Sequence, residues 1–161
     1  MRLLIDFDNT IVDWHEGIVR ELGEVEFVDT YNLYERYPDR TDEVMNVIHR
    51  PGFTLGLIPF DDALRVLKKL AKIHDVYICS ATHEDFYHSS NEKLEWIKIH
   101  LGKSWLHKVI LTYDKTLIQG DFLIDDKPII EGVILEPTWK HVHFGTEVKT
   151  WKEIEDRFGQ M

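Results

Sequence analysis

The chain has 161 residues, 43% of them hydrophobic and 12% aromatic, and a formal net charge of −10 at pH 7. This length fits one domain with a modest insertion, and the apolar content excludes a disordered chain. The negative charge disfavours binding to nucleic acid or to an anionic membrane surface, but it allows a small phosphorylated ligand held by local lysines or a metal ion.

Cysteine content and hydropathy restrict the setting of the protein. Cys79 is the single cysteine, so neither an intrachain disulfide nor a thiolate zinc site can form, and its place in the apolar run VYIC is typical of a buried small side chain. The first residues show no signal-peptide pattern, and no apolar stretch approaches the roughly 20 residues of a membrane span. We therefore expect a cytoplasmic protein without membrane contact.

The first predicted elements are two strands and a helix between them. Residues 2–7 (RLLIDF) and 75–80 (DVYICS) are short apolar runs of the kind that form buried strands. Residues 59–73 carry apolar side chains at helical spacing, and Pro59 suits the first turn of that helix.

The C-terminal half continues this alternation. Ser89 and Glu92 have the spacing of a capping box, and the helix that they would open extends to Gly102. Thr150 and Glu153 repeat the pattern before a last helix. Apolar runs predict further strands at residues 108–112, 121–126 and 141–144.

The region of residues 14–58 does not follow this rhythm. It has helical patterns and many aromatic side chains, and we interpret it as a small helical cap inserted after the first strand. The remainder, residues 1–13 and 59–161, predicts an α/β fold: a three-layer Rossmann-like core with a mostly parallel sheet. In such sheets, ligands bind beyond the carboxyl ends of the strands.

Chemically useful side chains follow four of the predicted strands. Taken singly, each has an ordinary explanation as a turn, a strand-end hydroxyl or a surface charge. Their order and their placement at one edge of the sheet argue for a shared site. They are Asp6 and Asp8, then Ser80, then Lys115, then Asp125 and Asp126 with Lys127 behind them.

This set of side chains suits the hydrolysis of a phosphate ester. Carboxylate oxygens from two strands form a site for Mg²⁺, and a hydroxyl, a lysine and the metal can hold a phosphate. A remaining carboxylate can attack phosphorus while another moves a proton.

A receiver domain, which carries phosphate on an aspartate, is a rival of a different class. It also places acids, a hydroxyl and a lysine on an α/β sheet. Its phospho-acceptor follows the third strand, whereas here that strand ends in ILTY and Asp114 belongs to the next loop. The order of the residues argues against a receiver.

The motifs resemble those of the haloacid dehalogenase superfamily of phosphohydrolases, read here as DFDNT at 6–10, Ser80, Lys115 and the Asp125–Asp126 pair. A closer resemblance is to the 5′(3′)-deoxyribonucleotidases, the cytosolic type C family of 5′-nucleotidases. It is carried by RPGF, VYICSAT, EKLEWIKIHLG, VILTYDKTLIQGDFLIDDKP and EPTWKHVHF. These stretches cover most of the chain after the cap.

The resemblance implies an enzyme that hydrolyses phosphoric monoesters. The implied substrates are nucleoside monophosphates, with 5′(3′)-deoxyribonucleotides expected first. Asp6 would be the nucleophile and form an aspartyl-phosphate, and Asp8 would be the general acid and base. A phosphatase of the same fold acting on a sugar phosphate or a cofactor stays an alternative.

The resemblance also implies a cofactor and its ligands. Mg²⁺ is the expected cofactor, and a homodimer is consistent with the family. The expected metal ligands are Asp6, the backbone carbonyl of Asp8, Asp125 and Asp126, and the expected phosphate-binding side chains are Ser80, Lys115 and Lys127.

Three positions near these motifs carry separate expectations. Asn9 stands where the family commonly has glycine, and Lys127 replaces an arginine, which keeps the charge but loses the planar fork. Thr10 is expected to hold the local turn through its side chain.

Aromatic residues of the cap are candidates for contact with a nucleobase. Trp14 and Phe53 are the expected pocket residues, whereas Tyr31 and Tyr34 are more typical of the cap's own core. His83 and His88, which follow Ser80, are interpreted as loop or surface residues and not as zinc ligands.

Overall fold

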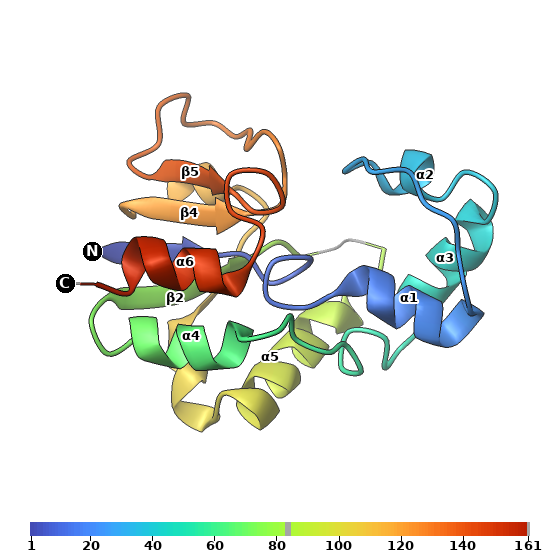
Figure 1. The fold of residues 1–161 in the computed structure, drawn as a ribbon, viewed down its shortest axis with the longest axis horizontal. Helices are drawn as coiled ribbons and strands as arrows, with labels where there is room; N and C mark the ends of the chain where they lie inside the picture. Colours follow the sequence, from blue (N-terminus) through green and yellow to red (C-terminus); the bar gives the residue numbers. More distant parts are fainter. Residues whose placement is uncertain (83–84, 161) are drawn as a thin grey trace.

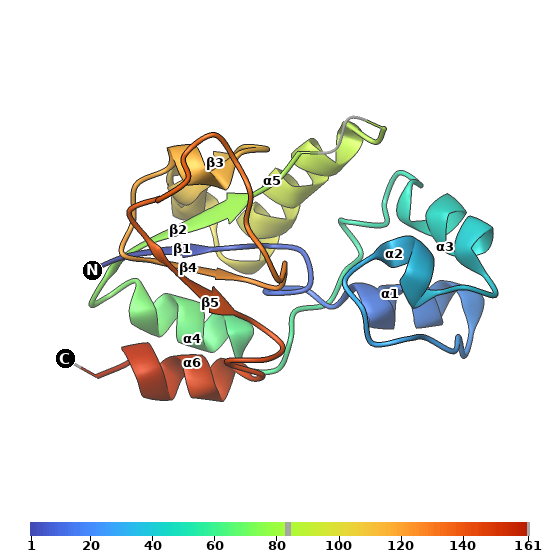
Figure 2. The same cartoon turned by 90° about the horizontal axis from the view of Figure 1, so that it is seen from above.

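The computed structural model describes residues 1–82 and 85–160, so His83 lies outside the described residues. A five-stranded sheet has the order β3-β2-β1-β4-β5, and every neighbouring pair of strands is parallel (Figures 1 and 2). The predicted α/β class with a mostly parallel sheet is confirmed. The strands are β1 (Arg2–Ile5), β2 (Asp75–Ser80), β3 (Val109–Leu111), β4 (Phe122–Asp125) and β5 (Lys140–His143).

The sheet buries both of its faces, but the two coverings differ. Side chains of one face, such as Leu3 and Ile78, share a core with residues of α4 (Ala63–Leu70), α5 (His88–His100) and α6 (Trp151–Phe158). The opposite face packs against Trp139 and neighbouring loop residues, and Cys79 is buried there as expected. Figure 2 shows α4 and α6 side by side along the sheet.

Short 3₁₀ helices lie on either side of β3: η1 (Lys103–Lys108) and η2 (Lys115–Leu117). The helix before η1 ends close to the predicted Gly102, whose backbone N donates to the carbonyl of Ile97. The positive φ of Gly102, 103°, suits a residue without a side chain.

Residues between β1 and α4 form the helices α1 (Trp14–Leu22), α2 (Leu33–Arg36) and α3 (Thr41–Ile48). Figures 1 and 2 show these helices as a lobe beside the sheet. The N-cap of α1 is Asp13, whose side chain accepts a hydrogen bond from the backbone N of Glu16.

The second connection between this lobe and the sheet is fastened to α5. Glu92 accepts hydrogen bonds from the backbone N atoms of Gly52 at 2.6 Å and Leu55 at 3.1 Å. One turn further along α5, Trp96 Nε1 donates to the carbonyl of Leu57 at 2.7 Å. Side chains of α5 therefore hold the segment at which the chain leaves the lobe and returns to the sheet.

Two local predictions at helix starts are wrong. Pro59 is not in the first turn of α4, whose N-cap is Asp62; it forms a bridge with Val12 instead. Ser89 does not cap α5, because the helix begins at His88 and Glu92 bonds to the preceding lobe.

The capping prediction at the last helix is correct for one of its two residues. Thr150 is the N-cap of α6 and accepts a hydrogen bond from the backbone N of Glu153. The carboxylate of Glu153 accepts from the backbone N of Lys149, one residue before the cap. Among the described residues, no helix is both long and apolar enough to cross a membrane.

Candidate active site

The loop after β1 turns at Asn9. This residue has a φ of 51°, in the left-handed region that asparagine tolerates better than most residues with a side chain. Its Oδ1 accepts a hydrogen bond from the backbone N of Trp14 at 3.2 Å. Asparagine can therefore stand in place of the expected glycine, because it tolerates this left-handed conformation, and its side chain adds a contact with the start of α1.

Thr10 does not make the side-chain hydrogen bond that we expected. Its buried Oγ1 has no hydrogen-bond partner within the described part of the chain, whereas its carbonyl accepts from Trp151 Nε1 at 2.9 Å. Backbone hydrogen bonds from Ile11 and Val12 to the carbonyl of Phe7 hold the turn instead.

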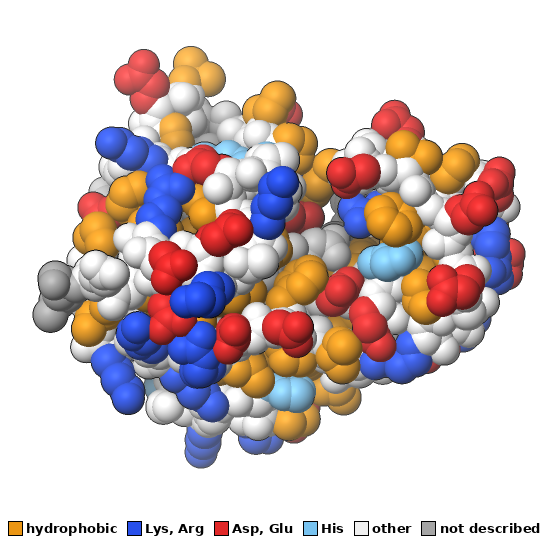
Figure 3. Space-filling view, in the orientation of Figure 1, with side chains coloured by type: hydrophobic (Ala, Val, Ile, Leu, Met, Phe, Trp, Pro, Cys, Tyr) orange, Lys and Arg blue, Asp and Glu red, His pale blue; other side chains and the backbone are white. Residues whose placement is uncertain are grey.

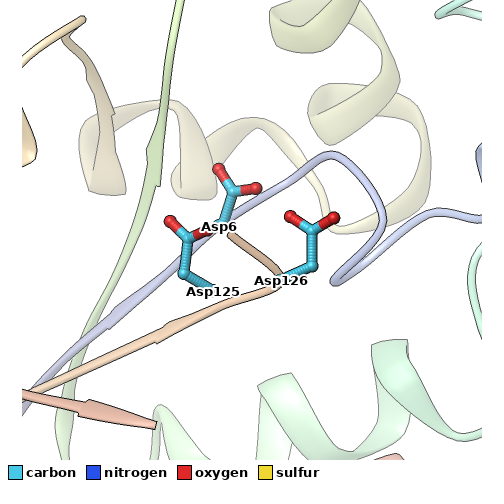
Figure 4. Close-up of side chains that lie close together, drawn as sticks. All are labelled: Asp6, Asp125 and Asp126. Atoms are coloured by element: carbon cyan, nitrogen blue, oxygen red, sulfur yellow. The ribbon is translucent and has the colours of Figure 1, made fainter. Parts of the chain in front are cut away.

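Three carboxylates meet at the ends of β1 and β4. The two strands pair with Ile5 opposite Ile124, so Asp6 and Asp125, one residue further along, are also neighbours. These two and Asp126 each offer an oxygen within 4.8 Å of the others. Figure 4 shows the three carboxylates pointing to the same side. Three hard oxygen donors fit a divalent cation such as Mg²⁺.

Lys115 neutralises part of this negative charge. It is buried at the start of η2, and its Nζ lies 2.6 Å from Asp6 Oδ1 and 2.5 Å from Asp125 Oδ2. Burial alone would lower the pKa of Lys115, but attraction to the two carboxylates outweighs burial and raises that pKa.

The carboxyl groups themselves have shifted pKa values. Burial raises the pKa of Asp6 to about 7; Lys115 opposes this shift, whereas other carboxylates add to it. Burial, and then the charges of Asp6 and Asp125, raise the pKa of Asp126 well above its ordinary value. A bound cation would favour the ionised form of both groups, so the shifts are consistent with a cation site.

The loop that carries Asp125 and Asp126 is held from β5. His141 Nε2 lies 3.3 Å from the carbonyl oxygen of Asp125, and His143 Nε2 lies 2.9 Å from that of Asp126. Lys127 donates its backbone N–H to Asp125 Oδ1 at 2.8 Å. Contact between the Lys127 ammonium and a phosphate stays a prediction.

The side chain of Asp8 points toward α1 and α5. Its Oδ1 accepts a hydrogen bond from Trp14 Nε1 at 3.1 Å, and its Oδ2 accepts one from Lys93 Nζ at 2.7 Å. The same ammonium lies 2.9 Å from the Oγ of Ser80, at the end of β2. Asp8 and Ser80, predicted from separate motifs, are thus joined by a residue that the sequence analysis did not select.

A signal for Lys93 was present in the helix pattern. The buried positions of α5 are Ser89, Lys93, Trp96 and Ile97, which recur at helical spacing along one face. A lysine on the buried face of a helix needs a polar partner inside the protein. The sequence did not reveal that partner, because Asp8 lies 85 residues away along the chain.

A cleft of about 530 Å³ lies between the core and the lobe of α1–α3, and Figure 3 shows the surface hollowed between these two parts. Asn9, Asp126 and Phe144 line it from the core, and His15 and Tyr31 line it from the lobe. Asp126 belongs both to the cleft and to the acidic cluster. A phosphate held near the cluster would therefore have room for the rest of its molecule in the cleft.

The cap aromatics have different surroundings. Tyr31 is half-exposed and lines the cleft, where partial burial of its hydroxyl and the charges of the acidic cluster raise the pKa of that hydroxyl. Tyr34 is exposed. Trp14 and Phe53 are buried, with ring centroids 5.7 Å apart in an edge-on contact. Within the described chain, neither of this pair lines the cleft, and Trp14 contacts the site through Asp8.

Comparison with known proteins identifies the same nucleotidase family that the sequence motifs resemble. Residues 3–158 match the family described as 5′ nucleotidase, deoxy (Pyrimidine), cytosolic type C protein. The cytosolic-type 5′(3′)-deoxyribonucleotidase of Homo sapiens is 33% identical over an alignment of 159 residues, and the alignment covers 89% of this chain and 79% of that protein. The mitochondrial 5′(3′)-deoxyribonucleotidase of Mus musculus is 30% identical over an alignment of 159 residues, which covers 89% of this chain and 72% of that protein.

A solved structure from Burkholderia xenovorans, described as a haloacid dehalogenase-like hydrolase, covers 78% of this chain and 72% of its own. Its TM-score is 0.40 and its sequence identity is 18%.

Proposed function

The chain belongs to the cytosolic type C 5′(3′)-deoxyribonucleotidase family and is a nucleotidase, and on this premise we propose that it hydrolyses deoxyribonucleoside monophosphates through an aspartyl-phosphate on Asp6. The observation that supports this most directly is the position of Asp6. It lies beside Lys115 and two further carboxylates, one of which, Asp126, lines a cleft large enough for a nucleoside.

The first step forms a bond between a carboxylate oxygen of Asp6 and phosphorus and breaks the bond from phosphorus to the nucleoside oxygen. Lys115 holds the Asp6 carboxylate in place through the 2.6 Å contact. Its positive charge also reduces the repulsion between that carboxylate and the incoming phosphate.

Asp8 handles the proton in both steps. As an acid it protonates the leaving nucleoside oxygen, and as a base it then takes a proton from the water that hydrolyses the aspartyl-phosphate. Its hydrogen bonds with Trp14 and Lys93 fix where that carboxyl group points. Ser80 is the donor that we assign to a phosphoryl oxygen.

Mg²⁺ is the cofactor that we propose, with Asp6, Asp125 and Asp126 as side-chain ligands. When bound, it would offset the negative charge of the phosphate and of the carboxylates around it. The backbone carbonyl of Asp8 stays a proposed ligand.

We propose that residues 14–58 act as a cap over a core formed by residues 1–13 and 59–161. The nucleoside would lie in the cleft between them, where Tyr31 and Phe144 offer aromatic faces. Closure of the cap would exclude water from the phosphate.

The setting that fits this activity is the cytoplasm, where nucleotides are the partners of the protein. We propose no nucleic-acid or membrane partner, and a homodimer is the oligomer that the family suggests.

The proposal is tested with a panel of 5′-, 3′- and 2′-monophosphates, deoxy and ribo, beside several sugar phosphates, assayed for phosphate release with Mg²⁺ and with excess chelator. Magnesium-dependent release that is fastest with deoxyribonucleotides supports the proposal. A strong preference for sugar phosphates would overturn the nucleotidase assignment, and full activity in chelator would overturn the metal assignment.

A further inference from the structure

Lys93 is a buried lysine in the first half of α5, next to the loop that follows β1. Its side chain is 1% exposed. Its Nζ lies 2.7 Å from Asp8 Oδ2, 2.9 Å from Ser80 Oγ and 2.8 Å from the carbonyl oxygen of Ala81. The ammonium thus joins the loop after β1, the end of β2 and α5.

The hydrogen-bonding capacity of an ammonium decides what these contacts mean. A lysine ammonium has three donors and no acceptor, and three acceptors lie around Lys93. Ser80 must therefore accept from Lys93. A hydroxyl has a single proton, so the proton of Ser80 is left to point away from Lys93.

The orientation of Asp8 is fixed in a similar way. One carboxylate oxygen accepts from Lys93 and the other from Trp14 Nε1. Two donors on different helices therefore hold the carboxyl plane, which restricts its rotation about the last side-chain bond. A carboxyl group that must meet a leaving oxygen gains most from this restriction.

We propose that Lys93 is a positioning residue that sets the direction of the Asp8 carboxyl group and of the Ser80 hydroxyl together. The inference rests on the proposed function, because it takes Asp8 as the acid and Ser80 as the phosphate donor. It assigns Lys93 no contact with the substrate. Its task differs from that of Lys115, which contacts Asp6 and Asp125.

The free-energy cost of burying the Lys93 ammonium indicates that this lysine does more than stabilise the fold. An ammonium taken out of water loses its hydration, and a well-packed apolar residue at such a position is often at least as stabilising as a buried ion pair. Methionine has nearly the length of lysine and fills irregular gaps in cores. Lys93→Met is therefore the substitution that removes the three hydrogen bonds with the smallest change in packing.

The test compares two substrates that differ in their need for an acid. The 5′-oxygen of a nucleoside leaves with difficulty unless it is protonated, whereas p-nitrophenolate leaves without a proton. With Mg²⁺ present, kcat/KM reports the first chemical step, in which the nucleoside or the p-nitrophenolate leaves. For Lys93→Met we expect kcat/KM to fall about 100-fold with a deoxyribonucleoside 5′-monophosphate and less than about tenfold with p-nitrophenyl phosphate.

Lys98→Met is the matched control on the same helix. Lys98 is half-exposed and pairs with Glu95 on the surface, so its replacement should change neither kcat/KM value by more than about twofold. The double variant Lys93→Met with Asp8→Asn should be less than about tenfold slower on the nucleotide than Asp8→Asn alone, because only the part of the Lys93 effect that acts through Ser80 remains once Asp8 is replaced.

The outcomes separate this inference from the proposed function. An equal loss on both substrates, or additive effects in the double variant, would overturn the positioning role while phosphatase activity of the wild type stands. A wild-type protein that releases phosphate from neither substrate overturns both. If Lys93→Met does not give a cooperative thermal unfolding transition, Lys93→Gln takes its place with the same expected difference between substrates.

Discussion

The ammonium of Lys115 lies 2.6 Å from Asp6 Oδ1, with both side chains more than nine-tenths buried. Removing a partner from a buried ion pair leaves an uncompensated charge, which typically costs about 3–5 kcal/mol. Lys115→Met would leave two buried carboxylates without this positive partner: Asp6 and Asp125, the second carboxylate that Lys115 contacts.

We therefore expect Lys115→Met to lower turnover by about 10²–10³-fold, since it removes a pre-placed positive charge from the phosphate site. In chelator, its free energy of unfolding should also fall by about 3 kcal/mol. Phosphate release and urea denaturation check the two effects. Lys152→Met, which changes a lysine with 68% of its side chain exposed, should alter neither.

Asp6→Asn should abolish turnover, because an amide is a poor nucleophile. We expect turnover to fall by at least about 10⁴-fold. After exposure to substrate labelled in its phosphate, the variant should carry no aspartyl-phosphate label. Asp6→Asn that retains turnover would remove Asp6 from the role of nucleophile. Because the substitution also removes a like charge beside Asp125 and Asp126, the variant should stay folded.

The raised pKa of Asp6 predicts how pH affects the metal-free protein. A folded-state pKa of about 7, against an ordinary value of 3.8, means that the folded protein binds a proton more tightly than the unfolded chain. The resulting stabilisation is full below the ordinary pKa and is lost as pH rises through about 7. Above that pH Asp6 is ionised, and Lys115 compensates its burial only in part, so a bound cation would add stability.

In chelator, the unfolding free energy of the wild type should therefore fall relative to that of Asp6→Asn as the pH rises from about 4 to about 7. Using the difference cancels the titration of groups elsewhere. Mg²⁺ should raise the melting temperature of the wild type more at about pH 8 than at about pH 5. A magnesium effect that is equal at both pH values would contradict the cation site.

Much of the core was predictable because its signals are local. The strands appear as short apolar runs, and β2 has the predicted bounds of 75–80. The shared edge of a parallel sheet then brings Asp6 and Asp125 together by topology alone. Lys115 was predictable in the same way, as the lysine that follows the third strand.

The remainder depends on contacts between distant segments. Glu92 has the spacing of a capping box, yet its carboxylate binds backbone N–H groups 37 and 40 residues away. Lys93 is invisible as a site residue until α5 is placed against the end of β2. Whether Tyr31 or Trp14 lines the cleft follows from how the cap packs, which the residue types do not determine.

The attachment of the cap to α5 predicts an effect at a distance from the chemistry. Glu92→Gln replaces a charged acceptor with a neutral one for Gly52 and Leu55, and hydrogen bonds to charged groups are worth about 1.5–3 kcal/mol. We expect a loss of about 1 kcal/mol in stability and a higher KM for nucleotides, since the cap would be held less firmly. Glu95→Gln, at a half-exposed position of the same helix, is the control.

Asn9 gives the sharpest test of a local conformation. At a φ of 51°, a residue without a polar short side chain pays roughly 1–2 kcal/mol, and loss of the hydrogen bond from the backbone N of Trp14 adds about 1 kcal/mol. Asn9→Gly removes only the hydrogen bond, whereas Asn9→Ala removes it and introduces the backbone strain.

Asn9→Ala should therefore be less stable than Asn9→Gly by about 1 kcal/mol in urea denaturation, after allowing for the larger conformational entropy of glycine in the unfolded chain. Both variants should keep Mg²⁺-dependent turnover, because Asn9 bonds the start of α1 and is not part of the acidic cluster. Since Asn9 also lines the cleft, the KM for nucleotides is the kinetic value that either change can alter. Equal stability of the two variants would mean that the turn adopts another conformation, and the explanation of Asn9 in place of glycine would fail with it.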